Sequence, residues 1–146
     1  MQVLNIINKI TMKTGKSIFA ITVLALMLSS SAMAQSETKV LAVINKADWC
    51  SVCKANDERA MAVFMKNNKG GVIKFFTNDV TNDQTKMKSK EELKMVGMDK
   101  VIEKYQGTGL VSFFNSQTRA FISQISVSET DNKLTDAMTA AIDSLN

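Results

Sequence analysis

The sequence predicts an α/β domain in which helices flank a central, mixed β-sheet. Residues 40–44, VLAVI, form a continuous apolar run, as expected for a parallel strand that is covered on both faces. A helical stretch separates this run from a second one, VIKFF at 72–76, so that strand, helix and strand form a parallel crossover unit. Two more strand-like runs, 110–114 and 120–125, lie close enough together to form an antiparallel hairpin.

The helices on either side of these strands are predicted from apolar residues at helical spacing. Between the first two strands, one buried helical face ends before the glycine pair at 70–71 and consists of Ala60, Met61, Phe64 and Met65. From about Thr130 onward, six apolar residues share another such face: Leu134, Ala137, Met138, Ala141, Ile142 and Leu145.

The segment 77–105 is expected to be polar at first and then helical. Ser89 and Glu92 have the spacing of an N-terminal capping box, and Gly97 is expected to end the helix that they begin. A second, short helix is predicted over 99–105. The predicted order of elements is therefore β-α-β-α-β-β-α.

The first 34 residues are predicted to be a secretory signal peptide, and residues 35–146 the folded domain. Lysines precede an eleven-residue apolar run, 18–28, and small residues precede the predicted cleavage site. Because a bilayer span needs about 20 residues, we expect a periplasmic or secreted protein without a stable membrane anchor. The signal pattern is complete from Met12 onward, so translation could begin at Met1 or at Met12.

The net charge of the predicted mature domain is close to zero. The whole chain carries a formal charge of +4, but the first 34 residues hold three lysines and no acidic residue, which leaves 15 basic and 14 acidic side chains. Most of the basic character therefore belongs to the signal segment. Nothing in the domain indicates a nucleic acid partner, and we expect no cofactor.

The stretch ADWCSVCK, residues 47–54, holds both cysteines and the only tryptophan of the chain. It lies at the junction between the first predicted strand and the helix after it. Cys50 and Cys53 could form a structural disulfide, as cysteines of exported proteins commonly do. A closed ring of only four residues, however, constrains the unfolded chain little.

A metal site is a second interpretation of the two cysteines. Zinc prefers four cysteine or histidine ligands, and the chain has two cysteines and no histidine. Copper(I) also accepts thioether ligands, which brings in Met87, Met95 and Met98. Methionines at such spacings are commonly core residues of helices.

A redox-active dithiol is the third interpretation, and the position of the cysteines favours it. If a helix starts at Cys50, the sulfur of this residue faces unpaired N–H groups and the positive end of the helix dipole, which favour the thiolate. Lys54 adds a cation one turn on, and Trp49 could cover one side of the site. Cys53 lies inside the first turn, where it is shielded and can attack a mixed disulfide formed by Cys50.

The motif WCxxCK at a strand-to-helix junction, within this order of elements, resembles the thioredoxin superfamily over nearly all of residues 37–146. ADWCSVCK, the polar stretch DVTND at 79–83 and a Gly-Thr-x loop before an apolar strand are similar to the C-terminal domain of the thiol:disulfide interchange protein DsbD family. The resemblance implies a thioredoxin-like fold and a domain that passes electrons from the membrane to exported partners. It also implies that Cys50 is the attacking thiol and Cys53 the resolving thiol.

Two positions depart from the pattern of that family. The family carries a cis-proline where this chain has Gly109, and the whole chain contains no proline. A cis bond before a non-proline residue costs about 2.5 to 4 kcal/mol, so we expect a trans Thr108–Gly109 peptide and a looser substrate-binding loop. Thioredoxins also bury an acidic residue where this chain has Ile44. Proton removal from Cys53 would then need water or another carboxylate, such as Asp48 or Asp57.

The sequence thus predicts an exported thiol–disulfide oxidoreductase that acts through a mixed disulfide, in the reducing direction. Exported proteins would be its substrates and an upstream thiol its electron donor. Six residues are predicted to form the site, with catalysis by the first two and support or substrate binding by the others: Cys50, Cys53, Trp49, Lys54, Thr108 and Gly109. The alternative is a non-catalytic thioredoxin-fold module that binds a partner or handles copper.

Overall fold

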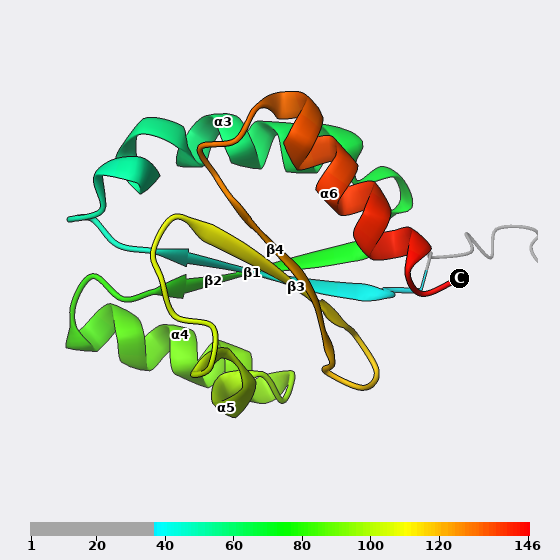
Figure 1. The fold of residues 1–146 in the computed structure, drawn as a ribbon. Coiled ribbons are helices and arrows are strands. Elements are labelled where there is room, and N and C mark those ends of the chain that lie inside the picture. Colours follow the sequence, from blue (N-terminus) through cyan, green and yellow to red (C-terminus); the bar gives the residue numbers. More distant parts are fainter. Residues whose placement is uncertain (1–36) are drawn as a thin grey trace, which may run out of the picture. The chain divides into compact units, whose positions relative to one another are not determined.

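A computed structural model describes residues 37–146, in which two pairs of helices lie on opposite faces of a four-stranded sheet (Figure 1). The signal peptide predicted for residues 1–34 lies outside the described residues. The elements, in chain order, are β1 (Val40–Lys46), α3 (Ser51–Asn67), a 3₁₀ turn (Lys69–Gly71), β2 (Ile73–Asp79), α4 (Asp83–Met95), α5 (Asp99–Ile102), β3 (Leu110–Asn115), β4 (Phe121–Ser126) and α6 (Asp131–Asp143).

The sheet is mixed, as the sequence predicts, with the strand order β2-β1-β3-β4. β1 is parallel to β2 and antiparallel to β3, and β3 pairs with β4 as an antiparallel hairpin. β1, the first strand of residues 37–146, is therefore an inner strand of the sheet. Its carboxyl end brings Lys46 beside Asp79 at the end of β2, and the dithiol follows directly.

Both faces of β1 are buried, which explains its continuous apolar sequence. Successive side chains of a strand point to opposite faces. Val40, Ala42 and Ile44 join a core beneath α3 and α6, whereas Leu41 and Val43 join a second core beneath α4 and α5 (Figure 1). The largest side chain that α3 contributes to the first core is Phe64, which stacks on Phe75 and meets Phe113 edge-on.

The end of α4 is close to its prediction, but its start is not. The helix begins at Asp83, and Asn82 and Thr85 form the capping box. Ser89, which the sequence pattern suggested as a cap, is buried within the helix, where its hydroxyl oxygen accepts the N–H of Asp79. The serine thus fixes α4 to the end of β2.

Three smaller predictions about the elements need correction. Met65 was assigned to the buried face of the first helix but is 61% exposed. α5 ends at Ile102, so the helix predicted over 99–105 is shorter. Residue 120 precedes β4, which begins at Phe121.

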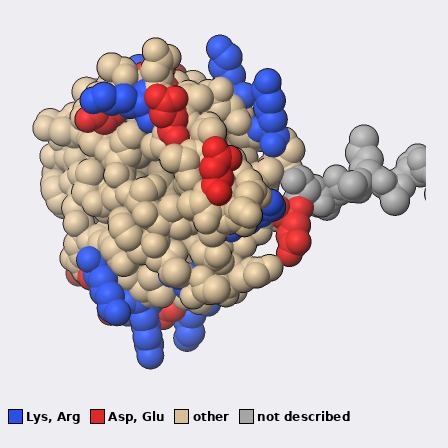
Figure 2. All heavy atoms as spheres, turned by 45° about the vertical axis from the view of Figure 1, so that its right-hand side comes forward, with Lys and Arg blue, Asp and Glu red and all other residues tan. Residues whose placement is uncertain are grey.

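The charged side chains of the domain are mixed in sign. On the face shown in Figure 2, basic and acidic groups stand mainly near the margins, and uncharged residues cover most of the centre. Among the described residues, no helix is long and apolar enough to cross a membrane.

Candidate active site

Cys50 caps the amino end of α3, and Cys53 lies in its first turn. After β1 the chain turns back, and the N–H of Cys50 donates to the carbonyl of Ala47 at 3.0 Å. Cys50 has extended backbone angles, and its Sγ accepts the N–H of Cys53 at 3.2 Å. The helix therefore begins one residue later than assumed, and the sulfur of Cys50 takes the place of the usual capping oxygen.

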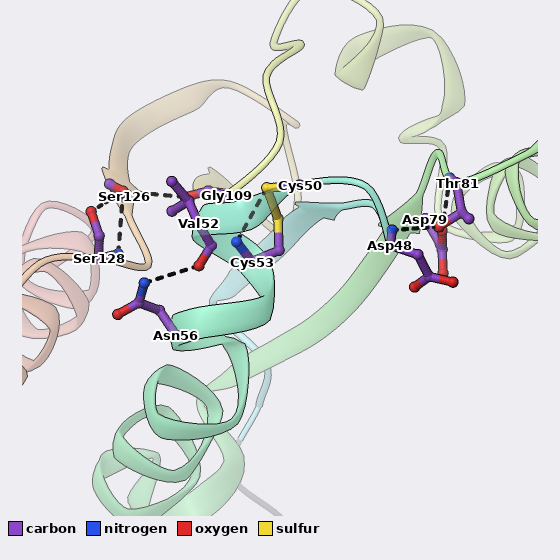
Figure 3. Close-up of a disulfide and its surroundings, with 10 residues drawn as sticks. All are labelled: Asp48, Cys50, Val52, Cys53, Asn56, Asp79, Thr81, Gly109, Ser126 and Ser128. Atoms are coloured by element: carbon purple, nitrogen blue, oxygen red, sulfur yellow. Dashed lines mark hydrogen bonds between the residues drawn. A yellow bond between two sulfur atoms is a disulfide. The ribbon is translucent and has the colours of Figure 1, made fainter.

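The two cysteines form a disulfide with their Cα atoms 5.3 Å apart (Figure 3). Cys50 is 7% exposed and Cys53 2% exposed, so Cys50 is the more accessible of the two. No acidic residue lies in the first turn of α3. On reduction, the helix dipole and the N–H of Cys53 would both favour a thiolate on Cys50.

Trp49 and Lys54, predicted to support the site, both have exposed side chains. Trp49 is 64% exposed and is not packed in either core. It borders a cavity of about 490 Å³ that also touches Thr108 and the amino end of α4. The backbone N–H of Lys54 donates to the carbonyl of Cys50, so this residue belongs to the first helical turn.

Gly109 lies beside the disulfide, and backbone hydrogen bonds anchor it on both sides. Its N–H donates to the carbonyl of Asn45 at 2.7 Å, and its own carbonyl accepts the N–H of Val127 at 2.9 Å. All peptide bonds in residues 37–146 are trans, the Thr108–Gly109 bond included. Backbone hydrogen bonds thus hold this loop without a proline.

Val52 was not among the predicted site residues, although it contacts the loop directly. A Cβ added to Gly109 would lie 3.0 Å from Cγ1 of Val52 and 3.8 Å from Sγ of Cys50. Gly109 also has a φ of +78°, in the left-handed region. Figure 3 shows Val52 and Gly109 together next to the disulfide. No pattern in the sequence pairs these two residues, because the contact joins a helix to a distant loop.

The position at which thioredoxins carry a buried acid is apolar, as expected, because Ile44 is a core residue. Of the two carboxylates proposed in its place, Asp48 is exposed, whereas Asp57 is half-buried. Oδ1 of Asp57 is buried without a hydrogen-bond partner in the described part of the chain. Burial raises the pKa of Asp57 above its ordinary value of 3.8, and the charge of Lys46 opposes part of this effect.

The three methionines considered for copper(I) do not lie in similar surroundings. Met98 is fully buried in the core beneath α4 and α5, whereas Met87 and Met95 are 63% and 81% exposed. Met98 is therefore a core residue. Within residues 37–146, no three His, Cys, Asp or Glu side chains cluster as a metal site.

The comparisons with known proteins give a structural neighbour but no match in sequence. The structure is similar to that of Trxlp from Edwardsiella tarda EIB202, with a TM-score of 0.44, 15% sequence identity, and coverage of 78% of this chain and 90% of that chain. Neither a family model nor a curated protein matches the sequence. The parallel β1–β2 pair, the antiparallel pairing of β1 with β3, the β3–β4 hairpin and the helices on both faces form a thioredoxin-like fold. This fold places a CxxC disulfide at the amino end of α3, an arrangement that can exchange thiols and disulfides.

Proposed function

We propose that this protein is an exported thiol–disulfide oxidoreductase that reduces disulfide bonds in other exported proteins. The observation that carries the proposal is the different placement of the two sulfurs. Cys50 stands at the amino end of a 17-residue helix, and Cys53 lies behind it, joined to it in a disulfide. A pair placed in this way can open and close without a rearrangement of the fold.

In the reducing direction, the reaction starts from the Cys50 thiolate and the Cys53 thiol. The thiolate attacks one sulfur of the substrate disulfide, forms a mixed disulfide and releases the other substrate sulfur as a thiolate. Cys53 then loses its proton and attacks the sulfur of Cys50. The second substrate thiolate leaves, and the dithiol has passed two electrons to the substrate.

The substrate is expected to bind as an extended segment along Thr108. Among residues 37–146, the N–H and C=O of Thr108 take part in no backbone hydrogen bond, so both can pair with a strand from a partner. The exposed ring of Trp49 offers apolar contact area nearby. The disulfide lies within reach of the same segment, because Gly109 adjoins it.

Export and the reducing direction rest on the sequence. The signal pattern of residues 1–34 supports transport across a membrane. The similarity of residues 47–54 to the C-terminal domain of the DsbD family favours a reductant, which an upstream thiol would reduce again. Recovery of a mature chain that begins at Gln35 from the periplasm or the medium would test the localisation.

The reduction potential of the pair tests the direction. The protein is equilibrated in glutathione buffers of known potential, and the two thiols are counted by alkylation and mass. A value near the thioredoxin range, about −270 mV, is expected for a reductant. A value near about −120 mV, the range of DsbA, would refute the reducing direction.

Single substitutions test the assignment of the two cysteines. Cys50→Ser should abolish the reduction of insulin disulfides, because it removes the attacking sulfur. Cys53→Ser should instead accumulate a mixed disulfide at Cys50, which mass spectrometry detects. Retained turnover in Cys50→Ser, or a mixed disulfide trapped by Cys53 in that variant, would contradict the mechanism.

A further inference from the structure

Asp57 is a polar residue within the apolar stripe by which α3 packs on the sheet. The buried residues of this helix are Cys53, Ala60 and Phe64. Asp57 follows Cys53 by four residues and precedes Ala60 by three, so it lies on the same face of the helix. On a regular helix, the Cβ atoms of Cys53 and Asp57 are about 5–6 Å apart.

One oxygen of the Asp57 carboxylate, Oδ1, is buried and lacks a hydrogen-bond partner among the described residues. Desolvation raises the pKa of this carboxyl, so its proton is held more tightly than in water. A carboxylate that is kept partly dry and unpaired beside a redox cysteine destabilises the fold, and this suggests a role other than stability.

The charged groups near Asp57 are exposed or have other partners. Lys46 acts on it from the end of β1, but the ammonium of Lys46 also lies 3.8 Å from Asp79 of β2. The remaining charged side chains on this part of α3 and facing it from α6 are exposed or paired with one another: Lys54, Glu58, Arg59 and Asp131.

The family's acid position, Ile44, and the other candidate carboxylate, Asp48, are both placed less well for this role than Asp57. Ile44 has no proton to exchange. Asp48 is exposed and lies in the turn before the dithiol, where its N–H donates to Oγ1 of Thr81 (Figure 3). Asp57 is the carboxylate that combines burial with a position one helical turn from Cys53.

We propose that Asp57 is the proton acceptor for Cys53 in the resolving step, an inference that rests on the proposed function. The Asp57 carboxylate takes the proton of the Cys53 thiol, directly or through one water molecule. The Cys53 thiolate attacks the sulfur of Cys50, a new S–S bond forms, and the bond from Cys50 to the substrate breaks. The substrate thiolate leaves with the electron pair, and Asp57 later releases its proton to solvent. In the reverse direction, Asp57 returns a proton to Cys53.

The test separates the two chemical steps. Reduced protein is mixed with an aromatic disulfide, 5,5′-dithiobis(2-nitrobenzoate), in a stopped-flow instrument. Attack by Cys50 releases the first coloured thiolate at a rate that depends on reagent concentration. Resolution by Cys53 releases the second one at a rate that does not. Asp57→Asn should leave the first phase unchanged and slow the second on the order of 10²-fold at pH 7, the lower range for a general base.

The pH profile separates proton transfer from a structural effect. In Asp57→Asn the second phase should accelerate with pH more steeply than in the wild type, because solvent and hydroxide must then remove the proton of Cys53. Asp57→Glu should restore part of the rate at pH 7. Asp48→Asn is the matched control and should follow the wild type. A second phase within twofold of the wild type from pH 6 to pH 9 in Asp57→Asn would overturn the proposal.

A stability measurement gives an independent readout. A carboxyl whose pKa is raised in the folded state destabilises the fold as pH rises from 3.8 through the folded pKa, and this cost persists at neutral pH. Oxidised Asp57→Asn should therefore resist urea at least as well as the wild type at pH 7, although it is slower. Lower stability together with slowing of both kinetic phases would identify Asp57 as a structural residue and refute the proposal. If the wild type shows no fast first phase at all, the proposed function fails instead.

Discussion

Replacing Gly109 by proline tests whether this loop can be converted into the form that the thioredoxin family uses. The structure predicts that it cannot. Gly109 has a φ of +78°, whereas proline fixes φ near about −65°. Proline would also remove the N–H that donates to the carbonyl of Asn45, a residue that is only 2% exposed.

The expected loss of folding stability follows from these contacts. An L-residue in the left-handed region costs roughly 1–2 kcal/mol. This is the expected loss of stability from the backbone of Gly109→Ala, and the close approach of the new Cβ to Val52 adds to it. For Gly109→Pro, an unsatisfied buried carbonyl adds about 1–3 kcal/mol, and the ring cannot adopt the observed φ. We therefore expect Gly109→Pro to lose about 3 kcal/mol or more.

Urea unfolding of the oxidised proteins measures both losses, with the slope of the transition checked for constancy. Gly109→Ala combined with Val52→Ala separates crowding from backbone strain, since only the crowding is relieved. Part of the loss should therefore remain in the double variant. If Gly109→Pro were as stable as the wild type and exchanged disulfides faster, the reasoning about this loop would be wrong.

Three further predictions concern the core, the end of β2 and the surface. Phe64→Ala should lower the free energy of unfolding by about 3–5 kcal/mol in urea titrations, because it empties a fully buried site between Phe75 and Phe113; a loss under 1 kcal/mol would show that the core refills. Burial raises the pKa of Asp79, but hydrogen bonds from Thr81 and the charge of Lys46 outweigh it and hold the pKa below 3.8. A lowered pKa stabilises the fold above 3.8, and this contribution is lost as pH falls through the folded pKa. Asp79→Asn should therefore be less stable than the wild type at pH 7 and converge with it in acid; a difference that is independent of pH would count against the assignment. Trp49→Ala should change stability by less than about 0.5 kcal/mol, lower the rate with protein disulfides and spare the rate with a small aromatic disulfide; equal rates with protein substrates would exclude a docking role.

The parts of the fold that could be predicted are those with a local pattern. The apolar run of β1 identified a strand buried on both faces, and the hairpin and the last helix followed from spacing alone. The start of α4 was missed because two capping patterns compete within one segment. Asn82 with Thr85 caps the helix, whereas Ser89 uses its hydroxyl to bind Asp79 of the neighbouring strand. A contact between elements overrode a local pattern in this case.

The site was predictable to the extent that it is local. The place of the two cysteines at the start of α3 followed from the motif and the strand before it. The contact of Val52 with Gly109 was not predictable, since the loop that forms it is more than 50 residues further along the chain. Asp57 was named from the sequence as one of two candidate carboxylates. Its place on the buried face could also have been found there, because residues 53, 57, 60 and 64 have the four-three-four spacing of one helical face, and a carboxylate in such a stripe is unusual.

The two departures from the family pattern, Ile44 and Gly109, meet at the end of β1. A cis-proline has no N–H, whereas Gly109 uses its N–H to satisfy the carbonyl of Asn45, the residue that follows Ile44 in the strand. Because Ile44 is apolar, this position of the sheet places no buried charge in the core beneath α3. The ionisable group beneath the dithiol belongs to the helix instead, at Asp57. Because this group and Cys53 share one rigid element, their separation should not depend on how the Gly109 loop moves when a substrate binds. The proton path to Cys53 therefore does not depend on the loop that contacts the substrate.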